Sequence, residues 1–211
     1  MTDADFLTKT GLGPAVTSGP AVASLRGAAR EPGRAVPARR APAATPSVEP
    51  ETLRQAFRRH AAGVTVVTLA GPAGPVGFTA TSVASLSAAP PLLSLSLSTS
   101  SSSAPALLAA ETLVVHLLSA GHEQIAQRFA TSGVDRFAPP IRWSALPTGE
   151  PVLSDVAVWL RARIDHRITA GQSYLVVAEV VDSRVARADE PLVYHDGRYG
   201  TIADAEPPSP L

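Results

Sequence analysis

Residues 92–98 read Leu-Leu-Ser-Leu-Ser-Leu-Ser, and this strict alternation is the feature that most limits how the chain can fold. Successive side chains of a β-strand point to opposite faces, so Leu93, Leu95 and Leu97 share one face and the serines between them share the other. The pattern therefore predicts a strand with its leucine face in a core. Because a hydroxyl needs a hydrogen-bond partner when it leaves water, the serine face indicates a polar partner.

The segments around this strand carry further signals of β structure. Residues 64–70 are rich in β-branched side chains, and a turn of glycine and proline separates them from residues 76–81, which predicts a hairpin. Further strands are expected at residues 112–118, 158–169, 173–185 and 191–195, and short helices at residues 51–60, 104–110 and 121–130. About six strands with two or three short helices predict a mainly β fold, a closed or nearly closed barrel with helical caps.

The domain organisation follows from a change of composition near residue 50. Residues 1–50 hold seven of the 20 prolines and a single aromatic residue, Phe6. Such a segment buries too little apolar surface to offset its ordering entropy, unless part of it docks on the folded body or on a partner. We expect a disordered Ala/Pro-rich leader at residues 1–50, one folded domain at residues 51–203 and a flexible tail at residues 204–211.

Composition and charge exclude several classes of function. The formal net charge is +0 and only 17% of the residues are charged, so no global field attracts nucleic acid. The absence of cysteine excludes disulfides, thiolate catalysis and cysteine-ligated metal, and it fits a reducing compartment. No apolar run has the length of a membrane span or of a signal peptide core, so we expect a cytoplasmic protein with no nucleic-acid or membrane partner.

The motifs of several enzyme classes are also missing. The sequence contains no GxSxG, HExxH or Walker motif. Its five histidines lack ligand-like spacing, and its aspartates are spread over separate predicted elements. We therefore expect no metal site and no catalytic acid or base.

Hydroxyl side chains are concentrated in two segments that contain no cation, residues 77–87 and 100–103. Ser103 suits a helix N-cap and Pro105 the first turn of the helix at residues 104–110, so unpaired helix amides would point back at the serines. A helix N-terminus surrounded by hydroxyls can hold a phosphate without a lysine. The alternative interpretation is a serine-rich linker followed by an ordinary cap.

The order of these segments resembles the flavin reductase domain of two-component monooxygenases, a flavin-binding split barrel with a Greek-key-like arrangement of strands. The resemblance runs from Leu53 to about Ile202. Its matching pieces are FRRHAAGVTVVT, GFTATSVASLSAAPPLL, SLSTSSSSAPALL, the Arg-Phe pair at 136–137, GQSYLVVAEV and YHDGRYG. Each piece alone is common, whereas the set in this order and spacing is specific.

The resemblance implies a homodimer that transfers hydride from NADH or NADPH to FMN or FAD and passes the reduced flavin to an oxygenase component. Because the cofactor performs this chemistry, no acid or base is required of the protein. The implied cofactor-binding residues lie along the ring edge (Thr79, Ala80, Thr81, Ser82), beside the ring and ribityl chain (Ser96, Leu97, Ser98), at the phosphate (Ser101, Ser102, Ser103) and against the ring (Phe137). On the nicotinamide side the resemblance implies Ser173 and Tyr199.

Some of these positions have a second interpretation. Phe137 and Tyr199 could equally be core aromatics, and Arg136 could form a surface ion pair instead of contacting a phosphate or carboxylate. Members of the family often carry His at the position of Ser173 and Asn at the position of Thr81, and this chain has neither.

These departures keep two other functions open. The barrel could catalyse another reaction on a small molecule, and a bound organic ligand without flavin binding would favour that function. It could also be a non-catalytic flavin-binding or assembly module that uses residues 1–50 as a tether.

Overall fold

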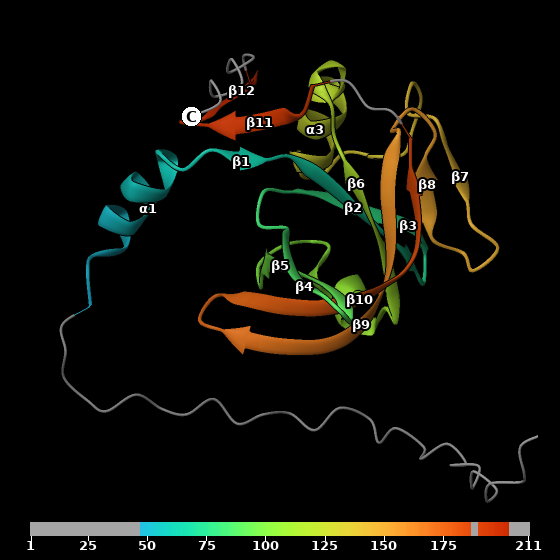
Figure 1. The fold of residues 1–211 in the computed structure, drawn as a ribbon, viewed down its shortest axis with the longest axis horizontal. Helices are drawn as coiled ribbons and strands as arrows, with labels where there is room; N and C mark the ends of the chain where they lie inside the picture. Colours follow the sequence, from blue (N-terminus) through green and yellow to red (C-terminus); the bar gives the residue numbers. More distant parts are fainter. Residues whose placement is uncertain (1–46, 187–189, 203–211) are drawn as a thin grey trace, which may run out of the picture. The chain divides into compact units, whose positions relative to one another are not determined.

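The computed structural model describes residues 47–186 and 190–202, in which the largest element is a seven-stranded antiparallel sheet (Figure 1). The strand order is β3-β2-β6-β9-β10-β5-β4. The strands are β2 (Thr65–Gly71), β3 (Gly74–Ala80), β4 (Ala84–Ala88), β5 (Pro91–Ser98), β6 (Thr112–Leu117), β9 (Val158–Ala170) and β10 (Ser173–Val185). The expected tail, and the expected leader up to residue 46, lie outside the described residues.

The sheet curls into a barrel because its two edge strands are consecutive in the chain. Only residues 81–83 separate β3 from β4, and such a connection reaches about 14 Å at most. A flat sheet of seven strands would hold its edges farther apart than this, at about 4.8 Å per strand. Two register shifts in the β9–β10 pair, between Val177 and Ala178 and between Val180 and Asp182, bend the long hairpin further. The predicted split barrel is confirmed.

Short elements surround the barrel. A three-stranded sheet has the order β1-β11-β12, and β7 pairs with β8 as a separate hairpin. These elements are β1 (Ala62–Gly63), β7 (Trp143–Ala145), β8 (Pro151–Leu153), β11 (Leu192–His195), β12 (Arg198–Thr201), α1 (Pro50–Arg58), α2 (Ala104–Ala109), the 3₁₀ turn η1 (Ala120–His122) and α3 (Glu123–Ala130). The predicted strands and helices are confirmed, whereas β1, β4, β7, β8 and β12 were not foreseen. No helix among the described residues is long and apolar enough to cross a membrane.

The leucine face of β5 lies in the barrel core, as its alternation predicts. Leu93 and Leu95 are buried against strands β2, β6 and β10, and the half-buried Leu97 packs on the same cluster. Burying a leucine contributes about 1.5–3 kcal/mol, so this face alone holds β5 firmly in place. A second cluster lies between α3 and the barrel. It contains Val64, Val66, Leu118, Ala126, Phe129, Phe137, Leu153, Val156 and Leu192.

One buried histidine is part of the scaffold and not of a site. His116 on β6 is fully buried, and its Nε2 accepts the N–H of Leu153 at 3.0 Å. Its Nδ1 therefore carries the proton and donates to the carbonyl of Val66 at 3.1 Å. Burial lowers the pKa of His116 to about 4, against the opposing effect of the bond to Val66. The neutral ring ties β6 to β2 and β8.

A buried carboxylate anchors the start of β8. Glu150 is 1% exposed, its Oε1 accepts a hydrogen bond from Nε of Arg161 at 2.9 Å, and Nη2 of Arg161 lies 2.8 Å from the same oxygen in an ion pair. The hydroxyls of Thr112 and Thr148 also donate to it. Burial alone would raise the pKa of Glu150, but the bonds from Arg161, the two threonines and its own backbone N–H prevail and lower it to about 2.

The Glu150 cluster generates a pH-dependent prediction. A carboxylate whose pKa falls on folding stabilises the fold above its unfolded pKa, and this stabilisation is lost as the pH falls through the folded pKa. Glu150→Gln should lower the free energy of unfolding at pH 7 by about 1–3 kcal/mol. The difference in unfolding free energy between this variant and wild type, measured by urea denaturation, should shrink as the pH falls from 4.5 to 2. The exposed Glu111→Gln is the control, and a difference independent of pH would contradict the assignment.

Candidate functional site

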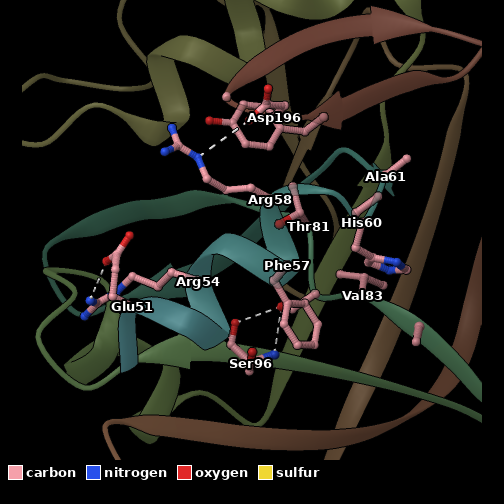
Figure 2. A pocket seen from close by; sticks show the side chains of 16 residues that line it. Glu51, Arg54, Phe57, Arg58, His60, Ala61, Thr81, Val83, Ser96 and Asp196 are labelled. Carbon is pink, nitrogen blue, oxygen red and sulfur yellow. Dashed lines mark hydrogen bonds and ion pairs between the residues drawn. The ribbon is translucent and has the colours of Figure 1, made fainter. Parts of the chain in front are cut away.

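A cleft of about 990 Å³ lies between the barrel and helix α1 (Figure 2). One wall, here called the strand wall, consists of Thr81, Ser82, Val83, Ala84 and Ser96. The opposite wall, here called the helix wall, comes from α1, the segment after it and the β11–β12 turn. Its residues are Glu51, Arg54, Phe57, Arg58, His60, Ala61, Ala62, Gly63, Tyr194, Asp196 and Gly197.

The strand wall is built around one bridging hydroxyl. Ser82 Oγ donates to the carbonyl of Ser96 at 2.9 Å and accepts the Ser96 N–H at 3.0 Å, which fixes the β3–β4 loop against β5. Ala80, the last residue of β3, is held by Thr65, whose Oγ1 donates to the Ala80 carbonyl at 2.8 Å. Within the part of the chain that the structure describes, the side-chain hydroxyls of Thr81 and Ser96 have no protein partner. They are available to a ligand in the cleft.

The helix wall depends on a two-residue hairpin turn. Asp196 and Gly197 have φ angles of +46° and +80°, the left-handed pair of a type I′ turn between β11 and β12. The Asp196 N–H donates to the carbonyl of Arg58 at 2.9 Å, and Oδ1 of Asp196 lies 3.8 Å from Arg58 Nε. This turn therefore positions the C-terminal end of α1, a helix with no buried residue.

Three of the predicted flavin residues, Thr81, Ser82 and Ser96, line the cleft. The others on these strands do not. Ala80 is buried at the end of β3, and Leu97 packs against the barrel core.

The remaining ring-edge residue, Thr79, uses its hydroxyl elsewhere. Its Oγ1 donates to the carbonyl of Ala126 at 2.6 Å, so the side chain is bonded to α3. Thr79 does not line the cleft.

The serines assigned to the phosphate form a separate turn before α2. Ser98 Oγ lies 2.9 Å from Ser100 Oγ, and the Ser98 carbonyl accepts the Ser101 N–H at 3.1 Å. Ser101 Oγ accepts the N–H of Ser103 at 3.2 Å, whereas Ser102 is exposed. Ser96 and Ser98 share a face of β5, but no residue of this turn lines the cleft.

Ser103 is the N-cap residue of α2, as predicted, but its side chain makes no capping bond. Its hydroxyl is buried and accepts Nη1 of Arg136 at 3.1 Å. Arg136 also donates to the carbonyls of Gly77 at 2.8 Å and Thr131 at 3.1 Å, and burial lowers its pKa. The predicted surface ion pair of Arg136 is therefore wrong for the described residues, since its partners there are neutral and structural.

The three other predicted site residues lie away from the cleft lining. Phe137 is 8% exposed and packs edge-to-face on Phe129 and Trp143 at 5.1 and 5.4 Å, which is the core interpretation of this aromatic. Ser173 lies at the end of the β9–β10 hairpin, opposite Ser98. Tyr199 packs on the second core cluster.

Tyr199 nevertheless connects that cluster to the cleft. It lies edge-to-face on Tyr194, a cleft residue, with ring centroids 5.2 Å apart. Burial, helped by the nearby Tyr194 and Glu123, raises the pKa of Tyr199, so its phenol stays neutral near pH 7.

Sequence reasoning missed the whole helix wall. Residues 51–60 read as an amphipathic helix, and an amphipathic helix usually packs its apolar face on a core. In the structure Phe57 is 65% exposed and lines the cleft with Arg54 and Arg58. The available signal was the spacing of Arg54, Phe57 and Arg58, which places two cations and an aromatic ring on one helical face.

Comparisons with known proteins agree on one family. The family model described as "Flavin reductase like domain" matches residues 57–203. A protein named NADH:FMN oxidoreductase from Rhodococcus qingshengii is 49% identical over 150 residues, which cover 69% of this chain and 78% of that protein.

Solved structures with the same fold include a flavin reductase domain protein from Arthrobacter sp. FB24, with 40% identity, a TM-score of 0.71 and coverage of 75% of this chain and 98% of that one. Streptomyces globisporus C-1027 NADH:FAD oxidoreductase SgcE6, solved with NAD and FAD fragments, has 29% identity, a TM-score of 0.70 and coverage of 77% and 100%. BorF, the flavin reductase component of a bacterial two-component tryptophan halogenase, has 26% identity, a TM-score of 0.67 and coverage of 74% and 100%.

The hairpin turn of the helix wall can be tested by two substitutions at one position. Asp196→Asn keeps a residue that tolerates positive φ and removes only an exposed ion pair, so its cost in unfolding free energy should be about 0–1 kcal/mol. Asp196→Val places a β-branched side chain at φ +46° and should cost about 1–2 kcal/mol more. Urea denaturation measures both, and equal effects of the two variants would refute the turn assignment.

Proposed function

The chain belongs to the flavin reductase like domain family, and from this premise we propose that it transfers hydride from NADH to FMN, bound along the strand wall of the cleft. The choice of FMN and NADH is supported by the named activity of the relative at 49% identity. The observation that carries the proposal is the strand wall itself, where the hydroxyls of Thr81 and Ser96 face a cleft and have no hydrogen-bond partner within residues 47–186 and 190–202.

The residues of this wall fit a phosphorylated, heteroatom-edged ring. The cleft volume of about 990 Å³ lies at the upper end of the roughly 300–1,000 Å³ typical of ligand pockets. The bridge between Ser82 and Ser96 holds the loop in place before a ligand arrives, so little ordering entropy is lost on binding. Ser98 lies on the same face of β5 as Ser96, and the turn that follows carries further hydroxyls, to which we assign the phosphate.

The bound flavin supplies the hydride acceptor and the nicotinamide supplies the donor. The chain's own residues orient the two rings and exclude water between them. Thr81 and Ser96 are neutral donors, which stabilise the negative charge of a reduced flavin less strongly than a cation would. A site of this kind releases its product, as a reductase that serves a separate oxygenase requires.

We propose that the recipient of the reduced flavin is an oxygenase component. This role is supported by the name of another solved structure of this fold, nitrilotriacetate monooxygenase component B from Mycobacterium thermoresistibile, which is 26% identical to this chain. A cytoplasmic location stays a prediction from the sequence.

The flavin proposal is tested by titration and by turnover. Purified protein should bind FMN at micromolar concentration, followed by flavin fluorescence, and should oxidise NADH only when flavin is present. Ser96→Ala should raise the Kd for FMN by about three- to tenfold, because one hydrogen bond of about 0.5–1.5 kcal/mol is lost.

The matched control is Ser144→Ala, an exposed serine of the β7–β8 hairpin, which should leave the Kd unchanged. If neither FMN nor FAD binds, the proposal fails. Flavin binding without NADH oxidation would favour a non-catalytic flavin-binding module.

We further propose that the protein is a homodimer. An apolar hollow of about 580 Å³ opens on the barrel surface and contains no charged side chain. Its lining includes Leu92, Leu117, Leu160 and Val180, of which Leu117 is 40% exposed. An apolar patch of this kind marks an interaction surface, and a second copy is the commonest partner.

Replacing a leucine of the hollow tests the dimer. Leu117→Glu should convert the protein to a monomer in sedimentation velocity, because the interface would bury an unpaired carboxylate. Leu108→Glu is the matched control, since Leu108 is 43% exposed on α2 and lies outside the hollow. A monomeric wild type, or equal effects of both substitutions, would contradict the proposed interface.

A further inference from the structure

The helix wall of the cleft has a chemistry that the flavin proposal does not use. Arg54, Phe57 and Arg58 follow one another at intervals of three and one residues, so they lie on one face of α1, and all three line the cleft. Figure 2 shows these side chains on the helix side of the cleft, with Ser96 on the strand side. None of the residues of α1 is buried. Contacts with the other described residues therefore do not explain why this face of the helix carries an aromatic ring and two arginines.

The two guanidinium groups retain hydrogen-bonding capacity. Arg54 donates to Glu51 at 3.3 Å through one nitrogen, and the two side chains are 70% and 62% exposed. Arg58 lies 3.8 Å from Asp196, which is an ion pair but not a hydrogen bond. Among the described residues the Arg58 guanidinium has no hydrogen-bond acceptor, although it carries five N–H donors. An anion with several acceptor oxygens, such as a diphosphate, would fill these positions.

The aromatic ring between them is equally open. Phe57 is 65% exposed, and its one ring contact among the described residues is an edge-to-face contact with His60 at 6.1 Å. Exposing a large aromatic ring to water is unfavourable unless something covers it. A flat, heteroatom-containing ring such as a nucleobase stacks well on such a surface.

The strand wall lacks both features. Thr81, Ser82 and Ser96 are neutral, and the residues that line this wall include no aromatic ring. The cleft therefore presents hydroxyls on one side. On the other it presents an aromatic ring and two arginines, each beside a carboxylate, Glu51 for Arg54 and Asp196 for Arg58. A dinucleotide has the same division, with a reactive ring at one end and an adenine linked to a diphosphate at the other.

Building on the proposed function, we infer that the helix wall binds the adenosine diphosphate half of a dinucleotide. Phe57 stacks on the adenine, and Arg58, with Arg54 beside it, pairs with the diphosphate. The reactive end of the dinucleotide then points to the strand wall. FMN has no adenosine diphosphate, so with FMN as the flavin the group bound at the helix wall belongs to NADH. FAD contains the same group, so with FAD as the flavin there are two sources of it.

The test compares NADH with reduced nicotinamide mononucleotide, which lacks the adenylate, as hydride donors to FMN. Phe57→Ala and Arg58→Gln should each raise the KM for NADH by about tenfold and leave the KM for the mononucleotide unchanged. ADP should inhibit the wild type competitively with NADH, and both variants should weaken this inhibition. Arg59→Gln is the matched control, because Arg59 follows on the same segment but does not line the cleft.

Two further measurements keep the outcome clear. FMN affinity, measured by fluorescence, should be the same in wild type and variants, so a failure of FMN to bind would refute the flavin proposal and not this inference. The ratio of the Kd values for FAD and FMN shows whether the bound adenosine diphosphate belongs to NADH or to FAD. If the variants raise the Kd for FAD but not the KM for NADH, the helix wall binds the diphosphate of the flavin. The inference is overturned if the KM values for NADH and the mononucleotide change equally, or if the variants alter sedimentation but neither KM nor FAD affinity.

Discussion

The structure depends on the short connection between β3 and β4. Because residues 81–83 join the two edge strands of a seven-stranded sheet, the sheet must close on itself. The connection then runs along the edge of β5 beyond the residues that pair with β4. The Ser82 hydroxyl then meets both backbone groups of Ser96. The same geometry that closes the barrel therefore places Thr81, Ser82 and Ser96 side by side, and the strand wall is a consequence of barrel closure.

The buried polar groups stabilise the fold, whereas the polar groups that face the cleft can still bind a ligand. On the outer face of the barrel, next to β8, His116 and Glu150 have all their partners within the protein, and they tie strands together. At the cleft, the Thr81 and Ser96 hydroxyls and the Arg58 guanidinium have unused capacity among the described residues. Buried polar groups must be satisfied for the fold to be stable, so groups that could still bond are found only where solvent or a ligand reaches them.

The two walls also differ in how firmly they are held. The strand wall is part of the barrel, whose leucines and valines are buried. The helix wall is carried by α1, which has no buried side chain and contacts the turn at Asp196 through one backbone hydrogen bond and one exposed ion pair. A rigid wall of hydroxyls for the proposed flavin and a lightly held wall with two arginines for the proposed second nucleotide suit a reaction in which two nucleotides must bind and leave in turn.

The local patterns of the sequence were sufficient for the mainly β fold, because period-two alternation at residues 92–98 and β-branched runs such as 64–70 act over a few residues. They also placed Ser103 at a helix N-cap, and the order of the motifs identified the family. They could not decide which polar side chains share a cleft. Ser103 turned to Arg136 and Thr79 to α3, while Phe57 faced the cleft, because these outcomes depend on contacts between residues distant in the sequence. What the sequence determined by itself was therefore the main strands, the buried face of β5 and the family. Only the tertiary structure decided which hydroxyls and cations remain free, since closing the barrel brings together partners that no local period encodes.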